Sequence, residues 1–152
     1  MMLETAYDIS RGKNNVFGLR EQRIILEVVI LDEPKKILYV QTSGTDTPER
    51  LYAPFILAST AVAMGIEATI YFVIRGVTVL KKGEAEKIKL GSFPTLKEVM
   101  DQAVKAGVKL EVCEQSCMLL GLERGGFVDV SKIVGAATLN DRILEADAVL
   151  SF

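Results

Sequence analysis

The chain has 152 residues, of which 49% are hydrophobic and 25% are charged, and this composition is typical of one globular domain. Its formal net charge of −2 arises from 18 basic and 20 acidic residues, so there is no overall electrostatic attraction to nucleic acid or to an anionic membrane. The absence of histidine and the presence of two cysteines argue against a structural zinc site and exclude a Ser-His or Cys-His catalytic pair within one chain. We therefore expect neither a metal nor a cofactor.

The expected location follows from what the sequence lacks. No segment has the roughly 18 uninterrupted apolar residues that a membrane helix needs. The first residues lack the basic start and the apolar core of a secretory signal, so we expect a cytoplasmic protein. In a reducing compartment the two cysteines are expected to be functional or buried free thiols rather than a structural disulfide.

Residues 1–34 are predicted to form an N-terminal extension or to add an extra strand. Residues 10–18 have the composition of a loop, whereas residues 23–31 form a continuous apolar-rich, strand-like run. This run is expected either to join the sheet or to reach a neighbouring subunit. The remaining residues, 35–152, are predicted to form an α/β domain.

The first half of this domain alternates between strand and helix patterns. Residues 36–42 are rich in β-branched and aromatic side chains and predict a strand, followed by a loop over 43–47. A helix is expected from there to about Met64, where Gly65 ends it; the helix is apolar nearly all round, so we expect it to be deeply packed. Residues 67–74 predict a second buried strand.

The second half continues the alternation. Residues 76–91 are expected to be a helix or an irregular excursion. The segments that follow predict, in order, a helix over 95–106, a strand over 107–112 that leads into Cys113, a short helix over 115–122, a fourth strand around 133–136, a helix over 139–145 and a closing strand over 148–152.

This pattern predicts a three-layer α/β/α fold with a mainly parallel, roughly five-stranded, flavodoxin-like sheet, because each parallel crossover needs a helix. Ligands and reactive side chains gather at the carboxyl ends of the strands in such sheets. The segments 43–47, 75–76 and 113–116 are all expected at that edge.

Cys113 is the best candidate for a reactive group, because it is predicted where a strand passes into a helix. Unpaired backbone N–H groups and the positive end of a helix dipole favour the thiolate, which is the nucleophile and the sulfur acceptor. The alternative is that a small thiol simply fills the end of a strand. Cys117 lies four residues further on, so it is either a second reactive thiol on the same helix face or a packing residue. Ser116 is expected either to donate a hydrogen bond to the Cys113 sulfur or to cap the helix.

The predicted loop after the first strand supplies candidate substrate-binding residues. Ser43, Gly44 and Asp46 would line the mouth of a pocket, or would only form a turn that caps the next helix. Arg75 and Arg50 are the cations nearest this edge. Either would stabilise a thiolate or hold a sulfonate oxygen, or would be an ordinary surface arginine.

The order of these segments resembles the DsrE/DsrF-like family of sulfur-relay proteins over residues 36–152. Four segments carry the resemblance, namely the strand, loop and helix start over 40–50, the helix end and strand over 61–73, the cysteine segment over 113–121, and the tail over 135–152. The third segment matches a family pattern of a cysteine, two variable residues, a serine and a glycine five residues beyond the serine. Cys117 departs from the related branch, where methionine is more common.

The resemblance implies a function. It implies that Cys113 accepts sulfur as a persulfide or thiosulfonate and passes it to a small carrier protein of the TusA type. It also implies a homo-oligomer, a trimer or a hexamer, and an activity of the sulfurtransferase kind.

Three other functions stay open. One is a thiol peroxidase or disulfide reductase, in which Cys117 resolves the oxidised Cys113. Another is a small-ligand or nucleotide-binding module, although residues 42–47 hold only one glycine and no phosphate-binding motif. The last is a structural subunit whose cysteines are inert.

Overall fold

The computed structural model describes residues 33–152; the predicted strand over 23–31, and almost all of the predicted extension, lie outside this part of the chain. From Pro34 onward the chain forms one compact unit. Its five strands are β1 (Lys36–Gln41), β2 (Glu67–Phe72), β3 (Lys109–Cys113), β4 (Ser131–Val134) and β5 (Ala148–Ser151). They form one sheet in the order β4-β3-β2-β1-β5, in which every pair of neighbours is parallel.

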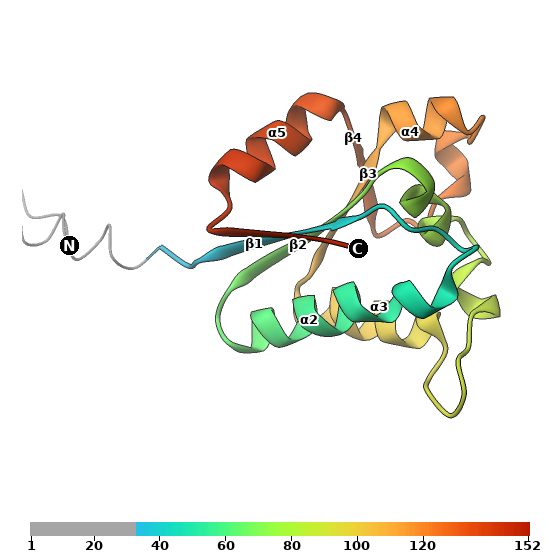
Figure 1. Cartoon of the computed structure of the whole chain (residues 1–152), viewed down its shortest axis with the longest axis horizontal. Helices are drawn as coiled ribbons and strands as arrows, with labels where there is room; N and C mark the ends of the chain where they lie inside the picture. The colour runs from blue at the N-terminus through green and yellow to red at the C-terminus, as the bar shows by residue number, and fades with distance from the viewer. Residues whose placement is uncertain (1–32) are drawn as a thin grey trace, which may run out of the picture. The chain divides into compact units, whose positions relative to one another are not determined.

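Helices cover both faces of this sheet. Figure 1 shows α2 (Tyr52–Ala63) and α3 (Leu96–Ala106) together on one face, and α4 (Glu114–Leu119) and α5 (Ala136–Glu145) on the other. The prediction of a three-layer α/β/α fold with a parallel, five-stranded sheet is therefore confirmed. Since all strands run in the same direction, their carboxyl ends lie at one edge, where β1, β2 and β3 each pass into a loop or helix.

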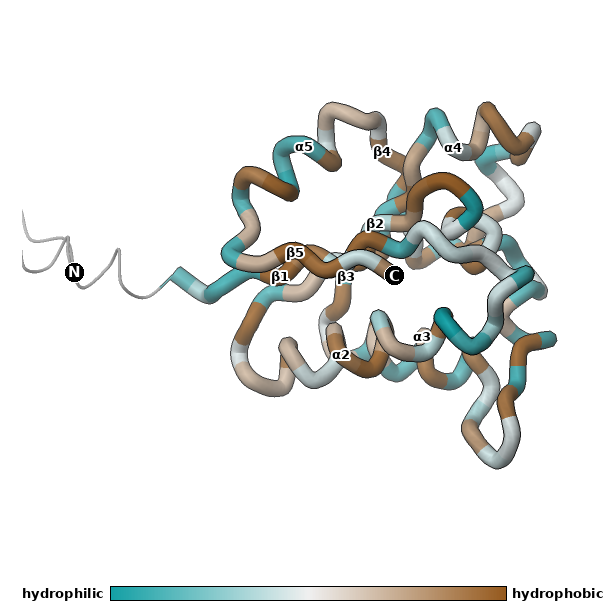
Figure 2. Tube along the Cα trace, viewed as in Figure 1, coloured by the Kyte–Doolittle hydropathy of each residue, from teal (hydrophilic) through white to brown (hydrophobic). Residues whose placement is uncertain are grey.

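The core explains why these segments form strands and helices. Figure 2 shows hydrophobic residues concentrated along the strands in the middle of the molecule. Side chains of the central strands and of the two helices on one face are fully buried, among them Tyr71, Phe55, Phe72, Leu38 and Ile70. The strands carry near-continuous apolar runs because a parallel sheet with helices on both faces is shielded from water on both sides.

The helix α2 corrects one expectation. It is apolar nearly all round, yet only one side of it is buried, through residues such as Phe55 and Ala58. Ile56 and Leu57 on its outer side are each 41% exposed. Only one face of the helix packs against α3 and the sheet. Because the sequence of α2 is apolar on every face, apolar side chains on its outer face remain exposed.

Several boundaries differ from the predicted ones by a few residues. The helix expected over 139–145 begins three residues earlier, at Ala136, and the fourth strand correspondingly ends at Val134. The second strand ends at Phe72 rather than at residue 74, because Ile74 adopts a positive φ of 57° and turns the chain into the 3-10 segment η3 (Ile74–Leu80). The excursion expected over 76–91 is therefore a series of 3-10 turns.

Candidate active site

Cys113 occupies the predicted position at the junction of strand and helix. It is the last residue of β3 and the residue that precedes the first turn of α4. β3 lies between β2 and β4, so the thiol is flanked by the ends of two neighbouring strands. Its residue is only 4% exposed. The sulfur is thus held inside the carboxyl edge of the sheet rather than on the surface.

Hydrogen bonds favour the charged form of this thiol. Burial raises the pKa of Cys113, but hydrogen bonds from the hydroxyl and backbone N–H of Ser116, from the Tyr71 hydroxyl and from the backbone N–H of Gln115 outweigh burial, and the pKa lies below its ordinary value. The neutral thiol has its own acceptor, since Sγ lies 3.7 Å from the Gln115 side-chain oxygen. The site can therefore hold both protonation states, with the thiolate more populated than in a free cysteine.

Ser116 connects this site to the turn after β2. Its Oγ accepts a hydrogen bond of 2.8 Å from the backbone N–H of Ile74, and its residue is buried. With a lone pair engaged by Ile74, the hydroxyl proton of Ser116 is free to point at the sulfur of Cys113. Ser116 was predicted either to bond the Cys113 sulfur or to cap the helix. The structure shows no side-chain cap at the start of α4.

Ile74 holds its N–H in this position at a conformational cost. A positive φ is rare for a β-branched residue, because its side chain crowds the backbone there. Such backbone conformations cost roughly 1–3 kcal/mol and concentrate at functional sites. The same residue exposes most of its side chain, so the apolar group and the strained backbone both lie beside the candidate reactive centre.

Cys117 differs from Cys113 in its electrostatics although both are buried, free thiols. Burial and the negative charge of the Cys113 thiolate raise the pKa of Cys117 above its ordinary value. Cys117 therefore stays neutral over the range in which Cys113 ionises. Between the two, Cys113 is the better nucleophile.

The loop residues predicted to bind substrate form a second cluster. Gly44 packs against η3 so closely that a Cβ there would lie 2.6 Å from the carbonyl oxygen of Arg75. Asp46 forms an ion pair of 3.2 Å with Nε of Arg75, and both side chains are about half exposed. Ser43 is instead paired with Arg50, whose Nη1 lies 3.4 Å from its Oγ.

The structure thus brings the predicted residues together in two groups rather than one. The first contains Cys113, Ser116 and Cys117; the second contains the 43–46 loop and Arg75. The first group follows β3 and the 43–46 loop follows β1, and β2 lies between these two strands. The segment η3 connects the groups, because Ile74 bonds Ser116 and Arg75 contacts the loop.

Sequence reasoning missed one residue beside the first group, Tyr71. The residue is fully buried in β2, and its hydroxyl donates a hydrogen bond of 3.2 Å to the carbonyl oxygen of Gly135. A buried phenol needs such a partner, so a tyrosine within an apolar strand was the available signal.

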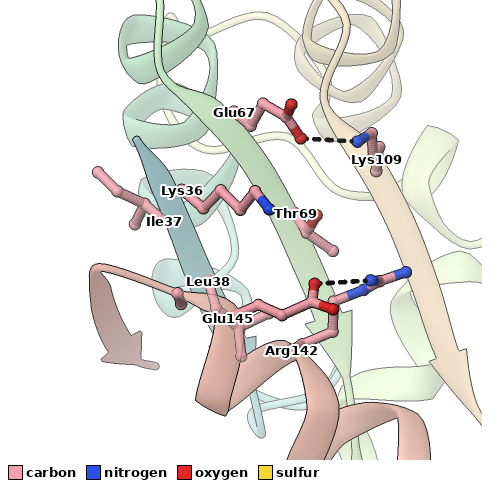
Figure 3. A pocket seen from close by; sticks show the side chains of 9 residues that line it. Lys36, Ile37, Leu38, Glu67, Thr69, Lys109, Arg142 and Glu145 are labelled. Atoms are coloured by element: carbon pink, nitrogen blue, oxygen red, sulfur yellow. Dashed lines mark hydrogen bonds and ion pairs between the residues drawn. The ribbon is translucent and has the colours of Figure 1, made fainter. Parts of the chain in front are cut away.

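A cleft of about 230 Å³ lies at the opposite edge of the sheet, at the amino ends of the strands (Figure 3). Charged side chains line it, namely Lys36, Glu67, Lys109, Arg142 and Glu145. Lys109 pairs with Glu67 at 3.0 Å and Arg142 pairs with Glu145 at 3.4 Å, so much of this charge is neutralised within the cleft. None of the predicted site residues lines it.

Residues 33–152 contain no group of three or more histidine, cysteine, aspartate or glutamate side chains that would hold a metal ion. Over the same residues, no helix is long and apolar enough to cross a membrane.

The fold and the cysteine at the end of β3 define a class of protein: the chain belongs to the DsrE/DsrF-like family, whose model matches residues 35–152. It is 31% identical over 103 residues to the uncharacterized protein MJ0760 of Methanocaldococcus jannaschii, a match that covers 68% of this chain and 38% of the relative. The chain thus matches well under half the length of that longer protein.

Two further proteins of similar sequence or fold are covered almost completely. The sulfur carrier protein DsrE2 of Allochromatium vinosum is 25% identical over 158 residues, with 78% of this chain and 98% of DsrE2 aligned. The crystal structure of YchN from E. coli superimposes with a TM-score of 0.65 and 18% identity, over 79% of this chain and all of YchN. The latter likeness establishes the fold.

Proposed function

We propose that the protein is a sulfur carrier of sulfurtransferase type, which accepts sulfane sulfur or a thiosulfonate on Cys113 and passes it to a partner thiol. The observation that carries this proposal is the set of hydrogen-bond donors around Cys113, which lowers the pKa of a buried thiol. Membership of the DsrE/DsrF-like family and the likeness to a protein named as a sulfur carrier support a role in sulfur relay.

The transfer consists of two displacements on sulfur. The Cys113 thiolate attacks the outer sulfur of a donor persulfide, a new S–S bond forms, the donor S–S bond breaks, and the donor thiolate leaves with the electron pair. With a thiosulfonate-forming donor such as tetrathionate, Cys113 keeps an S–SO₃⁻ group and thiosulfate leaves. In the return step an acceptor thiolate attacks the transferred sulfur bonded to Sγ, the Sγ–S bond breaks, and Cys113 leaves as a thiolate with the electron pair. A lowered pKa increases the fraction of Cys113 that is ionised for the first step, and it makes Cys113 a better leaving group in the second.

Access to the thiol requires α4 and η3 to separate locally, because Cys113 is buried. The contact between them includes the single backbone-to-side-chain hydrogen bond from Ile74 to Ser116. Met118 and Leu119 of α4 are 74% and 85% exposed, and Ile74, whose backbone bonds Ser116 of the same helix, is also exposed. We propose that a small carrier protein of the TusA type, or another thiol donor or acceptor, docks on this apolar surface. We further propose that Arg75, Ser43, Gly44 and Asp46, which lie in or beside η3, bind the substrate.

We also propose a cytoplasmic homo-oligomer, in line with the trimer or hexamer that the family resemblance implies. Apolar side chains on the outer faces of α2 and α5 support assembly, including Ile56, Leu57 and Leu144, the last of which is 85% exposed. Exposed apolar clusters of this kind mark protein contacts. Light scattering at several concentrations would give the number of copies, and a monomer at all of them would refute assembly.

Mass spectrometry tests the sulfur-carrier role. Reduced wild type, Cys113→Ser and Cys117→Ser are each incubated with polysulfide and, separately, with tetrathionate. We expect adducts on wild type and on Cys117→Ser, and none on Cys113→Ser. Adducts that need both cysteines would favour a relay or an internal disulfide and hence the peroxidase or reductase alternative. The proposal fails if Cys113→Ser accepts sulfur as well as wild type does.

Alkylation at different pH values provides an independent check on the assignment of the two thiols. The pKa of Cys113 is lowered and that of Cys117 is raised, so as the pH rises Cys113 is expected to react first. Slow and equal alkylation of both would instead indicate inert, structural cysteines. Peptide-resolved iodoacetamide labelling distinguishes the two results.

A further inference from the structure

Tyr71 lies across β3, next to the candidate reactive thiol. It pairs in register with Glu111 of β3, while its hydroxyl reaches the carbonyl of Gly135, directly after β4. Because neighbouring strands lie about 4.8 Å apart, a side chain that starts on β2 and ends at β4 must pass over β3. Cys113 is two residues after Glu111 on β3, and alternate residues of a strand point to the same face. The phenol therefore crosses the face on which Cys113 lies.

The Tyr71 hydroxyl has two acceptors to choose between at this point. It donates to the Gly135 oxygen at 3.2 Å, and its side chain crosses the face of β3 that carries Cys113, where it lowers the pKa of the thiol. A phenol has one proton, so it serves one acceptor at a time. The Gly135 oxygen also accepts from the backbone N–H of Thr138 at 3.1 Å, so it keeps a hydrogen bond when Tyr71 turns away.

We propose that Tyr71 is a positioning residue for sulfur transfer, which donates to the Gly135 carbonyl while Cys113 is a neutral thiol and turns its hydroxyl to the sulfur when Cys113 is a thiolate. The inference rests on the proposed function and extends it to a second residue. Tyr71 keeps its proton throughout; it stabilises the charge on sulfur before the first displacement and again when Cys113 leaves in the second.

The surroundings of the phenol favour this assignment. Burial raises the pKa of Tyr71, and the negative charges of Cys113, Glu111 and Cys117 add to the effect, so the hydroxyl stays protonated and remains a donor. The Glu111 carboxylate accepts a hydrogen bond of 2.8 Å from Nη2 of Arg142 at its Oε1. The Tyr71 hydroxyl donates to the Gly135 carbonyl and not to this carboxylate. Tyr71 is fully buried, so water does not substitute for it as a donor.

Peptide-resolved alkylation of Cys113 across a pH series tests the proposal on Tyr71→Phe. Loss of one hydrogen bond to a charged sulfur is expected to move the midpoint to higher pH and to lower the rate at neutral pH about tenfold. Tyr52→Phe is the matched control: its hydroxyl also lies within hydrogen-bond distance of two backbone carbonyls, those of Ile88 at 3.2 Å and Pro94 at 3.0 Å, but α2 covers the face of the sheet opposite to α4. We expect this variant to follow the wild-type profile.

The result that overturns the proposal is an unchanged pH profile in a folded Tyr71→Phe protein, or an equal shift in Tyr52→Phe. If Tyr71→Phe does not fold, wild type is labelled with 3-fluorotyrosine, which keeps the hydroxyl and makes it a stronger donor. The Cys113 midpoint is then expected to move to lower pH, and an unmoved midpoint refutes the role. Alkylation needs no sulfur donor, so a failure of sulfur loading in wild type would overturn the proposed function separately.

Discussion

Ser116→Ala tests whether this hydroxyl joins the turn after β2 to the thiol. The substitution removes the acceptor of the Ile74 N–H, a bond of 2.8 Å, and the donor to the Cys113 sulfur. A single hydrogen bond of this kind is worth about 1 kcal/mol of folding stability, and a partly buried donor left unsatisfied costs up to about 3 kcal/mol. We expect the free energy of unfolding to fall by about 1–2 kcal/mol, measured by urea denaturation.

The loss is expected to depend on pH in a specific direction. The folded-state pKa of Cys113 is lowered, so the stabilisation of its thiolate is present above the ordinary thiol range and is lost as the pH falls through the folded-state value. Part of this stabilisation comes from Ser116. The difference in stability between wild type and Ser116→Ala should therefore grow as the pH rises towards the ordinary thiol range, and the neutral-pH alkylation rate of Cys113 should fall severalfold.

Ser59→Ala is the control for Ser116→Ala. The Ser59 hydroxyl donates to the Phe55 carbonyl at 2.8 Å, within helix α2, and this carbonyl already serves the helix backbone. We expect a change within about 0.5 kcal/mol and a wild-type thiol. Our reasoning is refuted if Ser116→Ala matches wild type in both stability and alkylation, or if the two variants lose the same stability.

Two further substitutions test the frame around the site. In Gly76→Ala the new Cβ would lie 2.0 Å from the backbone carbonyl oxygen of Gln41, so η3 must move. We expect the free energy of unfolding, measured by denaturation, to fall by about 3 kcal/mol. Gly125→Ala is the control: a Cβ there would have no atom within 4 Å, so stability should change by about 0.5 kcal/mol or less. Arg142→Met leaves the Glu111 carboxylate, which is 4% exposed, without its ion-pair partner. We expect the free energy of unfolding to fall by about 2–3 kcal/mol. A fall of less than about 0.5 kcal/mol would show that this ion pair does not stabilise the fold.

Local patterns in the sequence were sufficient for the fold class and for the position of Cys113. Alternating apolar runs and helix patterns predict a parallel sheet because crossovers between parallel strands require helices. Gly65 adopts a positive φ directly after α2, as expected for the glycine that was predicted to end this helix. Boundaries near Ile74 and Ala136 were wrong by a few residues, since tertiary contacts rather than local propensity decide them.

The arrangement around the thiol could not be predicted in the same way. The hydrogen bonds from Ile74 to Ser116 and from Tyr71 to Gly135 join residues 42 and 64 positions apart in the chain. They depend on strand order and register, which no local pattern specifies. Only the structure revealed that Tyr71 passes over β3, and that Ile74 adopts a strained backbone to reach Ser116.

By itself the sequence determined which side chains can react, because it has two cysteines, no histidine and a strand that ends at Cys113. The tertiary structure alone decided which of the two thiols ionises more easily. Both are buried, and burial alone raises the pKa of each; the hydrogen-bond donors that β2 and α4 direct at Cys113 reverse this effect there and leave Cys117 neutral. Sequence specifies the chemical groups, whereas their mutual distances, and hence their electrostatics, exist only once the strands have paired.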